Sequence, residues 1–194
     1  MHRIATLSAV LLAQVMGLLS AAPSRANPEF NLGPPINTKA PDIGTPADQT
    51  GMPRALNSLM GEKGLVLFFF RSAAWCPFCQ AQMMDLNTGV AGMERRGYKL
   101  AGISYDKPDV LKTFIERRML TYTLLSDPKS EVIDRYKLRD PQYPPGNFAY
   151  GVPRPIIFIL DRNGVIKAKL YEDTYTKRPP ATLVIDTLDK VAKN

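Results

Sequence analysis

The feature that most constrains the fold is a pair of cysteines three residues apart, Cys76 and Cys79, the only cysteines in the chain. Ahead of them, residues 65–70 form a short, continuous apolar run that follows Gly64, which predicts a buried strand. Behind them, residues 77–93 carry apolar side chains at helical spacing, which predicts a helix. The pair therefore lies where a strand ends and a helix begins.

This position favours thiol redox chemistry. Residues three apart at a helix start lie on one face, with about 5–6 Å between their Cβ atoms, so a small adjustment brings the sulfurs to bonding geometry. Pro77 is tolerated in the first turn, where its missing N–H would have no partner inside the helix. We expect the helix dipole and the free N–H groups to favour the thiolate form of Cys76. We expect Cys76 to attack, the less exposed Cys79 to resolve, and Cys76–Cys79 to be the redox disulfide.

The N-terminus has the pattern of a secretory signal peptide. A basic start precedes an apolar run at 4–19 and a small-x-small site at 24–26, so we expect cleavage after Ala26 and a periplasmic or secreted protein. An uncleaved anchor helix is the alternative, although segment 4–22 is barely long enough to span a bilayer. No other segment is suitable, so we expect no stable membrane insertion.

Cleavage would restrict the chemistry of the mature chain. It would remove His2, the only histidine, so no imidazole would remain for general-base catalysis or metal ligation, and we expect no cofactor and no metal. The formal net charge would fall from +7 to +5, because Arg3 and Arg25 leave without an acid. The other basic residues are scattered, so we expect no nucleic-acid partner.

The rest of the chain predicts a proline-rich N-terminal extension, residues 27–64, and one α/β domain, residues 65–194. The extension would hold one or two short edge strands and a helical turn near 56–60. Further strands are expected at 65–71, 98–104, 121–125, 156–160 and 165–171, and helices at 77–93, at 108–119 with Asp106 as cap, at 126–136 and from 180 onward. A loop at 139–154, dense in aromatic residues and prolines, is a candidate cap over the active site. This order predicts a central mixed sheet flanked by helices.

Several motifs resemble a known family. The apolar strand, the Trp-Cys-x-x-Cys motif, the helix and the later run Val-Pro-Arg-Pro-Ile-Ile-Phe-Ile-Leu-Asp at 152–161 resemble the thioredoxin superfamily. The segments 40–42, 102–106 and 125–128 resemble its redoxin branch, the alkyl hydroperoxide reductase/thiol-specific antioxidant (AhpC/TSA, peroxiredoxin-like) family. The resemblance runs from residue 33 to the C-terminus. It implies a thioredoxin-like fold, with Cys76 as the nucleophile and Cys79 as the resolving cysteine.

The resemblance also indicates a substrate surface beside the cysteines. The candidate substrate-binding residues are Trp75, Pro77, Phe78, Arg154 and Pro155. Pro155 falls where the superfamily places a cis-proline that faces the disulfide, with Pro153 as the alternative. The backbone at Arg154 would then pair with a bound peptide or thiol substrate as a short β-bridge.

The sequence departs from the family pattern at positions that matter for the reaction. Phe70 stands where thioredoxins place a buried acid. If Cys79 is aligned with the peroxide-reactive cysteine of peroxiredoxins, Ser72 replaces the proline of the Pro-x-x-x-Thr-x-x-Cys motif and Cys76 replaces its threonine. Pro155 stands in the place of the peroxiredoxin arginine. The peroxide-activating set is therefore incomplete.

These observations favour an exported thiol–disulfide oxidoreductase. Its substrate would be a disulfide-bearing protein or a thiol, and its electron donor a thioredoxin-like or membrane partner. One alternative is a peroxiredoxin-like hydroperoxide reductase, in which a cysteine becomes a sulfenic acid. The other is a binding module without enzymatic activity, either redox-switched or carrying Cu(I).

Overall fold

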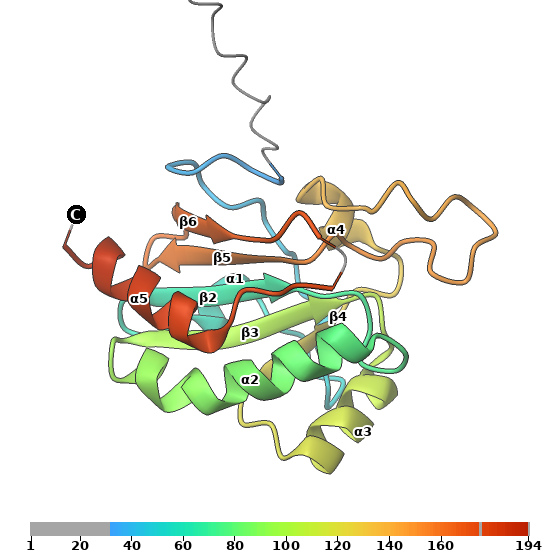
Figure 1. Cartoon of the computed structure of the whole chain (residues 1–194), viewed down its shortest axis with the longest axis horizontal. Coiled ribbons are helices and arrows are strands. Elements are labelled where there is room, and N and C mark those ends of the chain that lie inside the picture. The colour runs from blue at the N-terminus through green and yellow to red at the C-terminus, as the bar shows by residue number, and fades with distance from the viewer. Residues whose placement is uncertain (1–31, 175, 194) are drawn as a thin grey trace, which may run out of the picture. The chain divides into compact units, whose positions relative to one another are not determined.

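The structure is a computed structural model that describes residues 32–174 and 176–193. Its centre is a six-stranded mixed sheet in the order β1-β4-β3-β2-β5-β6 (Figure 1). The strands are β1 (Ala47–Asp48), β2 (Gly64–Phe69), β3 (Tyr98–Ser104), β4 (Thr123–Ser126), β5 (Ile156–Asp161) and β6 (Ile166–Leu170). The helices are α1 (Leu56–Leu59), α2 (Pro77–Glu94), α3 (Pro108–Arg118), α4 (Glu131–Arg135) and α5 (Ala181–Val191).

Strand β2 lies in the middle of the sheet and leads directly to the cysteine pair. It pairs in parallel with β3 and antiparallel with β5, and all of its residues are buried. Its side chains alternate between two core clusters, with Val66 and Phe68 in the first and Leu65 and Leu67 in the second. This period of two explains why a strand buried on both faces reads as a continuous apolar run.

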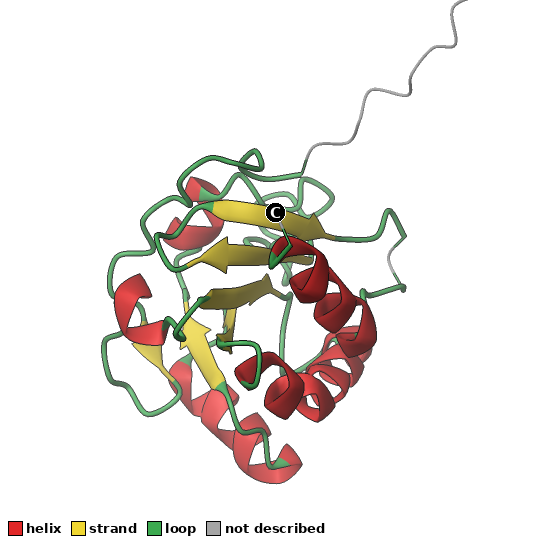
Figure 2. Cartoon of the chain, turned by 90° about the vertical axis from the view of Figure 1, so that its left-hand side faces the viewer, coloured by secondary structure: helices red, strands yellow, loops and turns green. Residues whose placement is uncertain are grey.

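Helices cover both faces of this sheet (Figure 2). The first cluster receives Met83 from α2, Leu111 from α3 and Val184 from α5. The second cluster receives Leu59 from α1 and Ile133 from α4. The expected mixed sheet flanked by helices is confirmed, and α2 holds the cysteines against the face formed by the first cluster.

The C-terminal hairpin and the extension before β2 also follow the prediction. The amide of Gly164 donates to the carbonyl of Asp161 at 2.9 Å in the turn between β5 and β6, and Gly164 has a φ of +75°, which glycine adopts without strain. The extension binds this hairpin, since the amide of Asn37 donates to the carbonyl of Ile166 at 2.7 Å. The predicted signal peptide lies outside the described residues. Within the described part, no helix has the length and apolar character needed to cross a membrane.

Helix α4 begins later than predicted. The expected helix started at residue 126, but α4 begins at Glu131, because Ser130 has a left-handed φ of +59°. The carboxylate of Asp127 accepts hydrogen bonds at 2.9 Å from the amides of the first three residues of α4. The Asp127 side chain therefore caps the start of α4, so Asp127 itself lies outside the helix.

The predicted cap of α3 is also wrong. The N-cap residue is Lys107, which makes no side-chain capping bond, and Pro108 occupies the first helical position. Asp106 turns instead toward the loop that precedes the cysteines. A proline at the first position lacks one of the N–H groups that a cap would bind, which reduces the need for a capping carboxylate.

Candidate active site

Cys76 and Cys79 form a disulfide at the start of α2, with their Cα atoms 5.2 Å apart. Cys76 is the N-cap residue of the helix and Pro77 follows at its first turn. The Sγ atom of Cys76 accepts the N–H of Cys79 at 3.3 Å. In the reduced protein the same N–H would face a thiolate at Cys76, which favours the ionised form of that thiol.

The expected difference in exposure between the two cysteines is absent. Both residues are fully buried, and both belong to the first core cluster, together with Phe70 and Met83. Phe70 is itself fully buried, so the place of the thioredoxin acid is apolar core.

The side chain of Trp75 links the cysteine pair to the aromatic loop at 139–154. Its indole Nε1 donates a hydrogen bond to the hydroxyl of Tyr105 at 2.9 Å. Its ring meets that of Phe148 edge to face, with 5.2 Å between the ring centroids. Phe148 is 75% exposed, so the tip of the loop forms an apolar surface next to Trp75.

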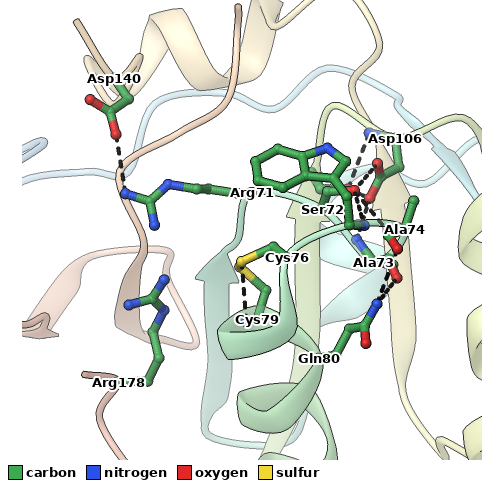
Figure 3. The surroundings of a disulfide bond; sticks show 12 residues. Arg71, Ser72, Ala73, Ala74, Cys76, Cys79, Gln80, Asp106, Asp140 and Arg178 are labelled. Atoms are coloured by element: carbon green, nitrogen blue, oxygen red, sulfur yellow. Dashed lines mark hydrogen bonds and ion pairs between the residues drawn. A yellow bond between two sulfur atoms is a disulfide. The ribbon is translucent and has the colours of Figure 1, made fainter. Parts of the chain in front are cut away.

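A buried ion pair connects the aromatic loop at 139–154 to the segment that precedes the cysteine pair. Arg71 directly precedes the cysteine loop, and its Nη2 lies 3.2 Å from Oδ2 of Asp140, with side-chain exposures of 5% and 2%. The amide of Gln142 donates to Oδ1 of Asp140 at 3.1 Å. Figure 3 shows Arg71 and Arg178 on the same side of the disulfide. Positive charge there favours a thiolate over a thiol.

A buried carboxylate holds the residues that precede the cysteines. Asp106 follows β3, and it accepts hydrogen bonds from the hydroxyl of Ser72 at 2.8 Å, the amide of Ala73 at 2.7 Å and the hydroxyl of Ser104 at 2.9 Å. Burial raises the pKa of Asp106, and these hydrogen bonds offset part of that rise. The sequence predicted that Asp106 would cap α3, but its carboxylate binds Ser72 and Ala73 instead. The available signal was its place at the carboxyl end of a strand parallel to the one that leads to the cysteines.

The cis-proline predicted at Pro155 is not present, because no peptide bond among residues 32–174 and 176–193 is cis. The backbone N–H of Arg154 donates to the carbonyl of Leu138 at 2.7 Å, and Pro153 forms an isolated antiparallel bridge with Arg139. The two ends of the aromatic loop thus pair with each other. The donor that was expected to bind a peptide substrate is already used inside the protein.

The remaining predicted substrate-binding residues lie around the first turn of α2. Pro77 is exposed and Phe78 is half-buried. Phe78 lines a hollow of about 240 Å³ that also involves Arg178 and Pro180, which precede α5. Within the described chain, no three acidic, histidine or cysteine side chains are grouped so as to hold a metal ion.

Together, a mixed sheet of this order and a disulfide at the start of α2 define a thiol-dependent oxidoreductase of thioredoxin-like fold. The model of the AhpC/TSA family matches residues 36–169. Peroxiredoxin Bcp of Escherichia coli (strain K12) is 32% identical over 128 residues, which cover 66% of this chain and 80% of that protein. A putative peroxiredoxin of Mycobacterium tuberculosis (strain H37Rv) is 33% identical over 133 residues, or 69% of this chain and 82% of that one.

The chain therefore belongs to the AhpC/TSA family. Among solved structures, peroxidoxin BcpB of Mycobacterium tuberculosis matches with a TM-score of 0.67 at 23% identity, covering 81% of this chain and 96% of that one. A yeast mitochondrial 1-Cys peroxiredoxin matches with a TM-score of 0.70 at 17% identity, covering 82% and 77%. These likenesses confirm the fold, and the family confirms the resemblance found in the sequence.

Proposed function

We propose that the protein reduces hydroperoxides, with Cys76 as the peroxide-reactive cysteine and Cys79 as the resolving cysteine. The observation that carries this proposal is the hydrogen bonding of the Arg154 amide, the group that was expected to bind a peptide substrate. The Arg154 amide is bonded to Leu138, and both cysteines are fully buried. A peptide substrate that binds as a short β-bridge would need that amide to be free, whereas a hydroperoxide needs no backbone partner. Membership of the AhpC/TSA family supports the same choice.

The reaction would proceed in two steps within the protein. The Cys76 thiolate attacks the terminal oxygen of ROOH, so an S–O bond forms, the O–O bond breaks, and the peroxide leaves as ROH after taking up a proton. Cys79 then attacks the sulfur of the Cys76 sulfenic acid, which forms the S–S bond and releases water. The guanidinium of Arg71 lies on the side of the disulfide seen in Figure 3. Its positive charge supports the thiolate in the first step, and the Asp140 carboxylate paired with it offsets part of that effect.

A dithiol partner would return the disulfide to the reduced state. One partner thiolate attacks a sulfur of the pair, the second partner thiol resolves the mixed disulfide, and the partner leaves oxidised. A thioredoxin-like or membrane donor fits this role. The second candidate function, disulfide exchange with a protein substrate, uses the same chemistry, and the Cys-x-x-Cys pair at the helix start supports it.

Parallel assays on the purified protein would separate the two functions. With a small dithiol as reductant, we expect rapid consumption of hydrogen peroxide and of an organic hydroperoxide, and slow reduction of insulin disulfides. Fast insulin reduction without peroxide consumption would support disulfide exchange instead. No turnover in either assay, with stoichiometric Cu(I) binding, would support the non-enzymatic module.

We also propose that the protein is exported and cleaved after Ala26. The support is the basic start, apolar run and small-x-small site of the N-terminal sequence. Mass spectrometry of the protein from a secreting host is expected to find Asn27 as the first residue, in the periplasm or the medium. A mature protein that begins at Met1 and stays inside the cell would contradict this proposal.

A further inference from the structure

We infer that Asp106 is a positioning residue for Cys76, and that it acts directly on the amide of Ala73 and through Ser72 on the amides of residues 74 and 75. Asp106 is not in the cysteine motif and comes 30 residues after Cys76 in the chain. It reaches the motif only because β3 lies beside β2 in the sheet. The inference rests on Cys76 being the attacking thiol of the proposed function.

The carboxylate of Asp106 binds the loop at two points. Oδ2 accepts the backbone N–H of Ala73 at 2.7 Å, and Oδ1 accepts the hydroxyl of Ser72 at 2.8 Å. Both Ser72 and Ala73 are almost fully buried, and Asp106 is 7% exposed. Water therefore cannot easily replace these bonds. Without the carboxylate, the buried hydroxyl of Ser72 and the buried amide of Ala73 would lack a hydrogen-bond partner.

Ser72 passes this restraint on to the residues nearest Cys76. Its Oγ accepts the amide of Ala74 at 2.9 Å and that of Trp75 at 3.4 Å. A hydroxyl group has one donor and two acceptor sites, so Ser72 is saturated when its proton points to Asp106. Three consecutive amides, at residues 73, 74 and 75, are thus held by one carboxylate and one hydroxyl.

The carbonyl groups of the same segment are held from the opposite side. The side-chain amide of Gln80 donates to the carbonyl of Ala73 at 2.8 Å and to that of Ala74 at 3.2 Å. Gln80 directly follows Cys79 in α2, so the loop is clamped between Asp106 and the active-site helix (Figure 3). This clamp fixes the backbone that enters Cys76, whose N-cap conformation (φ −93°, ψ 98°) lets its sulfur meet the helix N–H group.

The substitution Asp106→Asn tests the role because it keeps the shape but replaces one of the two acceptor oxygens with an NH₂ donor. In either orientation of the amide, its NH₂ group faces another donor. This donor is either the N–H of Ala73 or the hydroxyl of Ser72, whose oxygen already accepts two amides. We expect the loop to loosen, Cys76 to lose its contact with the helix terminus, and the pKa of the Cys76 thiol to rise. At pH values below that pKa, alkylation of Cys76 should slow by about tenfold for each tenfold loss of thiolate.

The sign of the effect separates positioning from simple electrostatics. Removing a nearby negative charge would by itself lower the pKa of a thiol, so a rise requires a change of geometry. Ser72→Ala, which keeps Asp106 and its bond to Ala73 but removes the relay to residues 74 and 75, should raise the pKa in the same direction. The double variant should be no worse than the more affected single variant, because both act on one network.

The experiment measures alkylation of the reduced protein by iodoacetamide across pH, with mass spectrometry to assign the label to Cys76 or Cys79. The alkylation assay uses no peroxide, so it can contradict the role of Asp106 even if the protein reduces hydroperoxides, and it can support that role even if the protein does not. Asp127→Asn is the matched control, since Asp127 is 5% exposed and also accepts three hydrogen bonds from neutral groups, but at the start of α4. All three single variants should lower the denaturation midpoint.

Only the two variants in the loop network should slow alkylation of Cys76. An unchanged or lowered pKa of Cys76 in both Asp106→Asn and Ser72→Ala would overturn the inference. An equal slowing in Asp127→Asn would overturn it too, because the effect would then follow general loss of stability. Should Asp106→Asn fail to fold, Ser72→Ala alone decides the outcome.

Discussion

In the Cys79→Ser variant, one exposure to hydroperoxide is expected to stop the reaction at a sulfenic acid on Cys76. Cys76 keeps its place at the N-cap of α2, where the N–H of residue 79 faces its sulfur, so the first step remains fast. The serine hydroxyl cannot attack the sulfenic acid to form a disulfide. Trapping with dimedone, followed by mass spectrometry of the peptide that contains residue 76, would detect the intermediate.

Cys76→Ser is the matched variant, and it should lose peroxide reduction. Removal of the nucleophile in a covalent mechanism is expected to lower the rate by on the order of 10³-fold or more. The circular dichroism spectrum should stay that of the native protein, because serine fits the volume of the cysteine. If Cys76→Ser instead reacts rapidly and the sulfenic acid forms on Cys79, the roles of the two cysteines are reversed, as in the alignment with the peroxiredoxin motif.

Asp140→Ala is expected to cause a large loss of stability. The variant leaves the guanidinium of Arg71 buried next to the cysteine loop without its carboxylate, and breaking a buried ion pair from one side costs about 3–5 kcal/mol. Both side chains are at most 5% exposed, so water cannot replace the lost partner. Chemical denaturation of the oxidised proteins would measure the difference in the free energy of unfolding.

The exposed pair Arg96–Asp189 provides the control for that experiment. Its Nε–Oδ1 distance is shorter, at 2.7 Å, but the side chains are 31% and 49% exposed. Solvent screens such a pair, so Asp189→Ala should change the free energy of unfolding very little. Similar losses in the two variants would show that burial does not determine the strength of the Arg71–Asp140 pair.

Much of the fold could be predicted because its signals are local. The buried strand before the cysteines, the helix after them and the β5–β6 hairpin follow from apolar periodicity and from Asn-Gly at a turn. The errors concern side chains whose partners are distant. Asp127 and Asp106 both resemble helix caps in sequence, but only Asp127 binds a helix start, and it does so later than the pattern indicated.

The site was predicted in part for the same reason. The residues next to Cys76 are enough to predict its place at a helix start, which favours a thiolate. In contrast, Arg71 is bound by Asp140, 69 residues away in the chain. Likewise, nothing local to Arg154 indicates that Leu138 occupies its amide. A bond between distant segments leaves no periodic or motif signal in one sequence.

The Cys-x-x-Cys pair, its place between strand and helix, and the mixed sheet flanked by helices were determined by the sequence alone, because short-range spacing and burial patterns dictate them. The thioredoxin-like class of fold was implied by the resemblance to a known family. The tertiary structure alone decided that the pair is buried, that the Arg154 amide is bonded to Leu138, and that Asp106 and Asp140 lie next to the residues that lead to the pair. Those properties depend on which strand ends meet at one edge of the sheet. That arrangement follows from packing of the whole chain, which brings together residues that share no sequence neighbourhood.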